Sequence, residues 1–398
     1  MVTSLASGSP KRALIIGSGV TVACSLAVFF TGAMAVQLSR DLGFGTVGIG
    51  GAVAVFFGTM GVTSIHLGRL VDRMGAIISL RIATAMAAIA SLAIALLAYN
   101  WLTLAVFLLV SGLAAALAQP AANRLLMYRV RSARLGTAFG FKQSAPPVSS
   151  MLAGLSVPMF ALTIGWRWAY ALIAVFALIA AVAVGPRPPS SPRPGMRAGR
   201  GKRVPLRHRG TLVVLAVGFG MAFIASTSVL AFFVDAAVFA GTDASVAGFV
   251  FAAGSLAAIT TRLVAGAAVD RFTFSPLRVS AALLGVGAIG LGLLATQHPT
   301  TMAVGAVIAL TGTWGFPGLF WFALVSAYPD TPGRITGAMA PSALGGILGP
   351  VGFGAVASNV SYSAAWSIAA ALAVLAAVAL LFGAHRLISA EIAEAELD

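Results

Sequence analysis

Two related strings follow apolar stretches of this chain, GRLVDR at residues 68–73 and GAAVDR at residues 266–271. Both have the pattern G-x-x-x-D-R, and they lie about half a chain length apart in a sequence of 398 residues. Other pairs keep nearly the same spacing: RLG at 134–136 with RITG at 334–337, GW at 165–166 with AW at 365–366, and Pro120 with Pro317. These matches predict two repeated halves that run in the same order.

The composition excludes a soluble globular protein. Hydrophobic residues make up 59% of the chain, charged residues only 9%, and the mean hydropathy is +0.99, whereas a soluble domain has about 25% charged residues. Apolar stretches recur from residue 13 to residue 382. Each is long enough to cross a hydrocarbon core of roughly 30 Å as a helix.

Gly, Pro, charged and turn residues divide the apolar sequence into spans. We expect an all-α polytopic membrane protein with twelve transmembrane helices in two six-helix pseudo-repeats. The predicted spans are 13–37, 46–67, 76–98, 101–124, 136–160 and 167–185 in the first half, and 211–234, 245–268, 277–296, 300–326, 335–358 and 363–384 in the second. A cleavable signal peptide ending near residues 33–35 is the alternative for the first span, but the apolar stretch exceeds the usual length of such a signal.

The basic residues orient the predicted spans. Of the 25 Lys and Arg residues, all but Arg40 and Arg167 fall on the side that holds the N-terminus, and Arg262 is assigned to that side with the others. The positive-inside rule therefore predicts that both termini are cytoplasmic. We expect an N-terminal half at 1–185, a basic, Pro-rich cytoplasmic linker at 186–210 that acts as a tether rather than as a lipid or partner site, and a C-terminal half with a short acidic tail at 211–398.

Several other functions are disfavoured. A net charge of +15 suggests nucleic-acid binding, but the basic residues sit at span ends and form no basic stripe with exposed aromatic residues. The sole cysteine, Cys24, lies in an apolar stretch, no two acids form a close pair within a span, and the four His are scattered. We therefore expect no enzymatic activity, no metal, no cofactor and no nucleic-acid partner, and we expect a monomer in the lipid bilayer.

The residues Gly68, Asp72, Arg73 and Gly75 match the G-x-x-x-D-R-x-G pattern, and with the topology and the repeat the chain resembles the major facilitator superfamily. The resemblance implies a secondary transporter in a bacterial inner membrane that works by alternating access, with spans 1, 4, 7 and 10 lining the path. GTAFGFKQS at 136–144 and GWRW at 165–168 resemble the cyanate-permease-like branch, which carries small metabolites. The basic pair usual after the first pattern is replaced by Ala76 and Ile77, and Thr273 stands where the second copy would have its closing glycine.

The two G-x-x-x-D-R strings are candidate conformational contacts. By analogy with the family, Asp72 should approach Arg334 at the start of span 11, and by the repeat Asp270 should approach Arg134 at the start of span 5. Such contacts stabilise one arrangement of the two halves; the alternative is that both carboxylates only cap loops and set topology. The candidate gating residues are Gly68, Asp72, Arg73, Gly75, Arg134, Gly266, Asp270, Arg271 and Arg334.

Polar and aromatic residues within the spans are the substrate candidates. Lys142 lies about 9 Å inside span 5, and an ion at that depth is functional by default, although its side chain can instead snorkel to the surface. Asp235, near the end of span 7, is a candidate proton carrier or an ordinary interfacial acid. The amide residues among these candidates can instead form hydrogen bonds between helices, and the tryptophan residues can instead face lipid. The substrate candidates are Gln119, Asn123, Lys142, Gln143, Trp314 and Trp321, the last two flanking Pro317, which frees a backbone carbonyl.

These residues favour transport of a small anion, coupled to a proton, because Lys142 is accompanied by amides and span 1 contains no acid. Proton-coupled efflux of drugs or other apolar compounds is the second hypothesis. It is favoured by the aromatic residues of span 10 and by the G-x-x-x-G-P spacing at 345–350. A receptor or scaffold is a third hypothesis, but it would leave the repeated strings without a role.

Overall fold

The computed structural model describes residues 10–129, 135–185, 209–269, 271–272, 274–327 and 338–395. Every regular element in these ranges is a helix. Eleven of the described helices are long and apolar enough to cross a membrane. The predicted linker, apart from Arg209 and Gly210, lies outside the described residues.

The helices before the linker form the N-terminal group. Their bounds are α1 (Pro10–Ala33), α2 (Ala35–Leu42), α3 (Thr46–Met74), α4 (Ala76–Leu97), α5 (Trp101–Arg129), α6 (Leu135–Gln143), α7 (Ala145–Ser156), the π-helical turn η2 (Val157–Ala161) and α8 (Trp166–Val184). The fifth predicted span is therefore α6, α7 and η2 in succession. The other eleven predicted spans match the eleven membrane-length segments, two of which each contain two successive helical elements.

The helices after the linker form the C-terminal group. Their bounds are α9 (Arg209–Phe239), α10 (Ala244–Val269), α11 (Pro276–Leu294), α12 (Pro299–Gly315), α13 (Pro317–Ala327), the 3-10 turn η3 (Ala340–Leu344), α15 (Gly345–Asn359) and α16 (Tyr362–Ala395). The tenth predicted span is broken at Phe316, before Pro317. Proline has no N–H to continue the helical hydrogen-bond ladder, and this explains the break.

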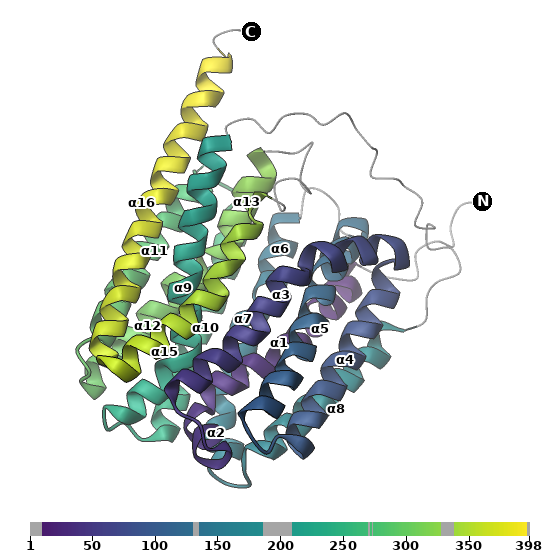
Figure 1. Ribbon diagram of the computed structural model, residues 1–398. Coiled ribbons are helices and arrows are strands. Elements are labelled where there is room, and N and C mark those ends of the chain that lie inside the picture. Colours follow the sequence, from purple (N-terminus) through teal and green to yellow (C-terminus); the bar gives the residue numbers. More distant parts are fainter. Residues whose placement is uncertain are drawn as a thin grey trace.

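The two groups lie side by side, with α1–α8 in one part of the molecule and α9–α16 in the other (Figure 1). They meet where α1 packs on α9, α3 on α15, and α7 on α10. We call the end of the molecule at which α1 begins and α16 ends the terminal side, and the other end the opposite side. In Figure 1, α16 ends at the top of the molecule, which is therefore the terminal side.

Glycines allow close contact of the two groups toward the opposite side. A Cβ atom on Gly154 of α7 would lie 2.6 Å from the carbonyl oxygen of Gly248 of α10, and a Cβ atom on Gly248 would lie 2.6 Å from that of Gly154. Ser255 of α10 donates a hydrogen bond of 2.7 Å to Ser150 of α7 close by. In this conformation the two groups are closed against each other at that crossing.

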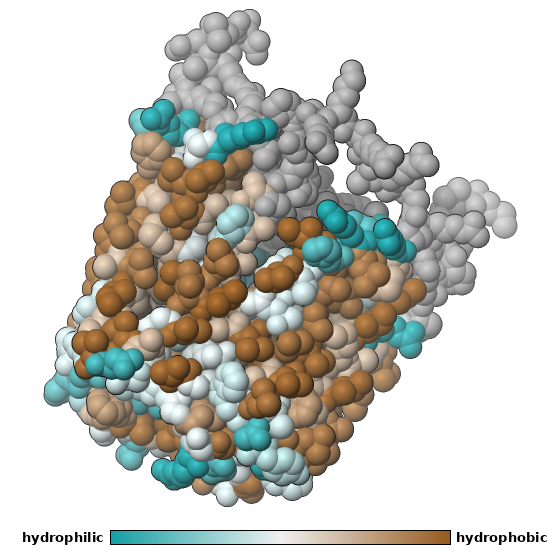
Figure 2. Space-filling view, viewed as in Figure 1, coloured by the Kyte–Doolittle hydropathy of each residue, from teal (hydrophilic) through white to brown (hydrophobic). Residues whose placement is uncertain are grey.

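The outer surface suits a lipid environment. Large apolar side chains project from the flanks of the bundle, among them Ile89, Val182 and Ile289. Figure 2 shows hydrophobic residues over much of the visible flank and hydrophilic residues gathered toward the two ends. By contrast, α1 packs on helices of both groups, including α5, α7, α8 and α9, and is the most buried of the eleven long spans.

Candidate functional site

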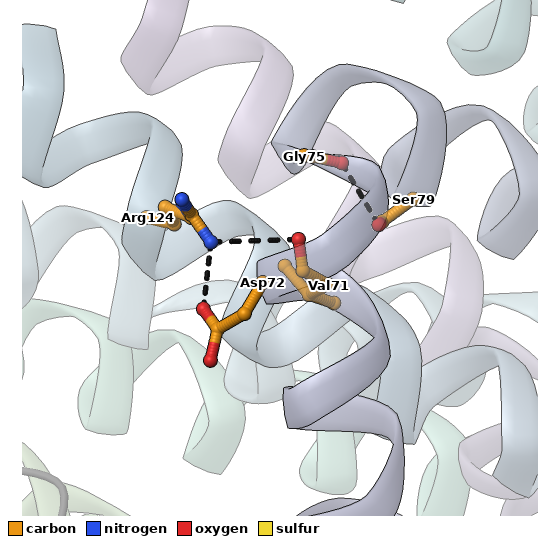
Figure 3. Close-up of polar contacts among 5 residues, drawn as sticks. All are labelled: Val71, Asp72, Gly75, Ser79 and Arg124. Carbon is orange, nitrogen blue, oxygen red and sulfur yellow. Dashed lines mark hydrogen bonds and ion pairs between the residues drawn. The ribbon is translucent and has the colours of Figure 1, made fainter. Parts of the chain in front are cut away.

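Asp72 forms an ion pair near the end of α3 on the terminal side. Arg124 of α5 places Nη1 2.6 Å from Oδ1 of Asp72 and 3.4 Å from the carbonyl oxygen of Val71 (Figure 3). The carboxylate is 72% exposed, and exposed ion pairs contribute only about 0–1 kcal/mol to stability. Asp72 is thus held from within its own group, by a contact that is easily broken.

Gly75 fixes the geometry of this corner. Its φ of 87° lies in the region that favours glycine, and its N–H closes α3 on the carbonyl of Val71 at 2.8 Å. Ser79 of α4 donates to the carbonyl oxygen of Gly75 at 2.9 Å (Figure 3). The closing glycine of the first G-x-x-x-D-R-x-G string therefore makes the turn from α3 into α4.

The predicted partners of the two repeated strings cannot all be placed. Arg334, Asp270 and Arg134 lie outside the described residues, so the approaches of Asp72 to Arg334 and of Asp270 to Arg134 stay predictions. Gly68 is open, with no atom near the position of a Cβ, and Arg73 and Arg271 are exposed. Gly266 is buried and faces Gly140 of α6.

Lys142 is buried inside the bundle and does not reach toward solvent. Its side chain is 1% exposed. The ammonium donates hydrogen bonds to Oε1 of Gln119 on α5 and, at 3.4 Å, to Oε1 of Gln143. Three of the predicted substrate residues are therefore in direct contact, and the snorkelling alternative does not describe this conformation.

A second buried cation, Arg262 of α10, lies beside this cluster. Only 4% of its side chain is exposed, and the guanidinium donates to the main-chain carbonyls of Gln143 in the N-terminal group and Trp314 in the C-terminal group. The assignment of Arg262 to the cytoplasmic surface is therefore wrong. Its depth was a usable signal: it stands six residues inside the predicted span 245–268, as Lys142 stands six residues inside 136–160.

Prolines expose main-chain carbonyls at this site. A helix would satisfy the carbonyl of Gln143 with the N–H of residue 147, but Pro147 has none, and Arg262 donates to that carbonyl instead. Pro317 likewise leaves the carbonyl of Thr313 open, and the hydroxyl of Ser226 on α9 donates to it at 2.8 Å. Both breaks therefore hold cross-helix hydrogen bonds.

The two predicted tryptophans have different surroundings. Trp314 is buried; its indole N–H donates to the carbonyl of Ser226 at 3.0 Å, and its ring lies 5.5 Å from that of Phe29 on α1. Trp321 packs instead on Phe219 and Phe320. Trp314 thus borders the cluster around Arg262, whereas Trp321 belongs to an aromatic cluster of the C-terminal group.

Asn123 carries an unsatisfied acceptor. It lies one helical turn from Gln119 on the same face of α5, toward the terminal side. Its Oδ1 atom is buried and has no hydrogen-bond partner among the described residues. Such an atom costs about 1–3 kcal/mol, so this position is suited to a water molecule or a polar solute.

A small cavity adjoins Arg262. It lies between α6, α10 and the broken span α12–α13, and its volume is about 20 Å³, room for a single water molecule. Its lining is formed by Gly140, Arg262, Ala265, Gly266, Val269, Gly315, Gly318, Leu319 and Phe322. A solute of several heavy atoms requires the helices to separate.

Three of the described carboxylates inside or near the spans are engaged elsewhere. Asp235 accepts a hydrogen bond from the hydroxyl of Tyr362 on α16, toward the opposite side. Asp41 accepts from the indole of Trp166 at 2.8 Å, and Asp72 pairs with Arg124. Among the described residues, no carboxylate forms an ion pair with Lys142 or Arg262.

Comparison with known proteins identifies the fold. The sequence model described as Major Facilitator Superfamily matches residues 16–343. A comparison with curated proteins finds no match.

Proposed function

Because the chain belongs to the Major Facilitator Superfamily, whose members are transporters rather than enzymes, we propose that it moves a small anionic solute across the membrane by alternating access. One observation carries the proposal. Lys142 and Arg262 are both buried, both contact Gln143, and no described carboxylate forms an ion pair with either of them. Ions inside a membrane protein are costly and mark substrate pathways.

The neighbouring polar groups support an anion site that is reached from the terminal side. The amide of Gln119 orients Lys142, and the unsatisfied acceptor Oδ1 of Asn123, one turn nearer that side, can be satisfied by a water molecule on the route to the site. An anion would accept charge-assisted hydrogen bonds from the two cations, and such bonds are about twice as strong as neutral ones. Trp314 borders the site, and Trp321 supports it only through packing.

Alternating access in this proposal is a rocking of two halves, 1–185 and 211–398, joined by the linker 186–210. The positive-inside rule puts the terminal side in the cytoplasm, so the contacts of α7 with α10 close the extracytoplasmic side. The ion pair of Asp72 with Arg124 and the predicted contacts to Arg334 and Arg134 bias the populations of the two states. A monomer in a bacterial inner membrane, related to the cyanate-permease-like branch, is the setting that we infer.

Proton coupling belongs to the same proposal. Asp235 is the candidate carrier because its carboxylate lies within α9, partly buried and bonded to Tyr362. The site around Lys142 contains no described acid that could take this role. Proton movement is therefore assigned to a second position, toward the opposite side.

The test is a current measurement on purified protein in liposomes on a solid-supported membrane, with internal pH read in parallel. A panel of small carboxylates and inorganic anions is applied with and without a pH gradient. We expect a response to one anion class that Lys142→Gln removes, because this variant deletes the charge and keeps the amide neighbours.

Arg81→Gln is the matched control, since it deletes an exposed charge on α4 and should keep the response. An unaltered response in Lys142→Gln would contradict the proposed site. If no anion of the panel gives a response, and lipophilic cations or apolar drugs cause proton release, the efflux hypothesis is favoured instead.

A further inference from the structure

We propose, resting on the proposed anion transport, that the solute is a compact dianion whose two negative charges bind Lys142 of the N-terminal group and Arg262 of the C-terminal group. The inference begins from the positions of the two cations. Lys142 stands seven residues after the start of α6, and Arg262 seven residues before the end of α10. At 1.5 Å per residue both lie about 10 Å from the terminal-side ends of their helices.

Both cations retain hydrogen-bonding capacity. An ammonium has three N–H donors and a guanidinium five. The ammonium of Lys142 donates to Gln119 and Gln143, and the guanidinium of Arg262 to two carbonyls. Every one of these acceptors is neutral, so an anion that reaches the site offers each cation a stronger acceptor than it now has.

The charge balance favours two negative charges rather than one. Leaving one member of a buried charged cluster without its counter-charge is strongly unfavourable. Among the described residues, the carboxylates of Asp41, Asp72 and Asp235 are engaged by other partners. A monoanion would therefore neutralise one cation and leave the other uncompensated in the protein interior.

The geometry favours a short distance between the two negative groups. Gln143 contacts both cations, since its side-chain Oε1 lies 3.4 Å from Nζ of Lys142 and its main-chain oxygen accepts from Arg262. Because both cationic groups contact the same residue, the distance between them is about the length of one residue. The cavity that adjoins Arg262 holds only about one water molecule, but Gly140 and Gly318 leave its walls without side chains, so a solute can enter there when the helices separate.

Binding measurements with matched pairs of ligands test the number of charges. Purified full-length protein in lipid nanodiscs is titrated by calorimetry with succinate and with its monoamide, succinamate, at about pH 7.5, where every free carboxyl is ionised. Sulfate and perchlorate form the tetrahedral pair, again with two charges against one. We expect the dianion of one pair to bind about 30-fold or more tightly than its monoanion, as expected when a buried charge loses its partner.

Variants test the two cations separately. Lys142→Gln and Arg262→Gln should each reduce the preference for the dianion to less than about threefold, because each leaves one buried cation. Arg81→Gln and Arg278→Gln delete exposed charges on α4 and α11 and should keep the preference. Monodisperse elution and an unchanged Tm show that a variant is folded; if Arg262→Gln fails this check, Lys142→Gln decides.

The outcomes separate the two proposals. Equal binding of dianion and monoanion, or a preference that persists in a folded Lys142→Gln variant, overturns the dianion inference and leaves anion transport standing. If no anion binds and the liposome panel is silent, both proposals fail. A length series from malonate to adipate tests compactness, and tighter binding of adipate than of succinate would also overturn the inference.

Discussion

Arg124 holds Asp72 from within the same group of helices, and the carboxylate stays largely exposed. We predict that Asp72→Asn lowers turnover by about fivefold, since a contact worth about 1 kcal/mol changes a population ratio by that factor. Solute affinity should stay within a few fold, because Lys142 bonds to Gln119 and Gln143 rather than to Asp72. Initial transport rates and equilibrium binding measure the two quantities.

Arg69→Gln is the control for this variant, because Arg69 is an exposed neighbour on the same helix. It should leave turnover unchanged. Full activity of Asp72→Asn would mean that the carboxylate only caps the corner between α3 and α4.

At the scale of residues, the sequence identifies Lys142 as a site residue but does not identify Arg262. Both lie at the same depth, but amide residues accompany Lys142 in the sequence, whereas Arg262 stands without them near the terminal-side end of its span. Hydropathy shows how far along a span a charged residue lies, but it does not show which face of the helix the side chain occupies. The contact with Gln143 could not be predicted, since it depends on the packing of α6 against α10.

At the scale of elements, the breaks in α6–α7 and α12–α13 determine which backbone groups the site can use. We predict that Pro147→Ala raises anion affinity by about fivefold. The new N–H can bond to the carbonyl of Gln143 and so release Arg262 from one acceptor, and a net hydrogen bond is worth about 1 kcal/mol. Calorimetry on the anion found active in liposomes measures the change.

Pro146→Ala is the matched control, because its new N–H faces the carbonyl of Lys142, to which Arg262 does not donate. Its affinity should equal that of the unchanged protein. Lower affinity in Pro147→Ala would show that the contact of Arg262 with Gln143 shapes the site rather than competing with the solute.

The sequence predicts some of the helix breaks but not others. The break at Pro317 follows from one residue, since proline cannot continue a helix, and the free carbonyl was expected. The break at Ser144 was not predicted, although Pro146 and Pro147 follow it. The first span is predicted to continue to residue 37, but α1 ends at Ala33, and the turn at Met34 and the short helix α2 depend on packing against α3 and α9.

At the scale of the whole molecule, the crossing of α7 and α10 must open if the two groups rock. We predict that a disulfide between Ser150→Cys and Ser255→Cys, in a Cys24→Ala background, stops most transport and that a reductant restores it. The two hydroxyl oxygens are 2.7 Å apart, which suits the short Cβ–Cβ separation of about 3.5–4.5 Å in a disulfide.

The single-cysteine variants, treated with the same lipophilic oxidant, are the controls and should transport in both redox states. Mass spectrometry of the intact protein verifies the crosslink. A crosslinked protein that transports at the reduced rate would show that the two groups do not separate at this crossing.

The narrow cavity beside Arg262 also limits the leakage of protons through the protein. A proton crosses a membrane protein along a continuous chain of water molecules or titratable groups, and a space of about 20 Å³ holds one water in a hydrocarbon layer of about 30 Å. In this conformation the described residues therefore leave no space at this point for such a chain. A membrane containing many copies would then retain the ion gradient on which uphill transport depends.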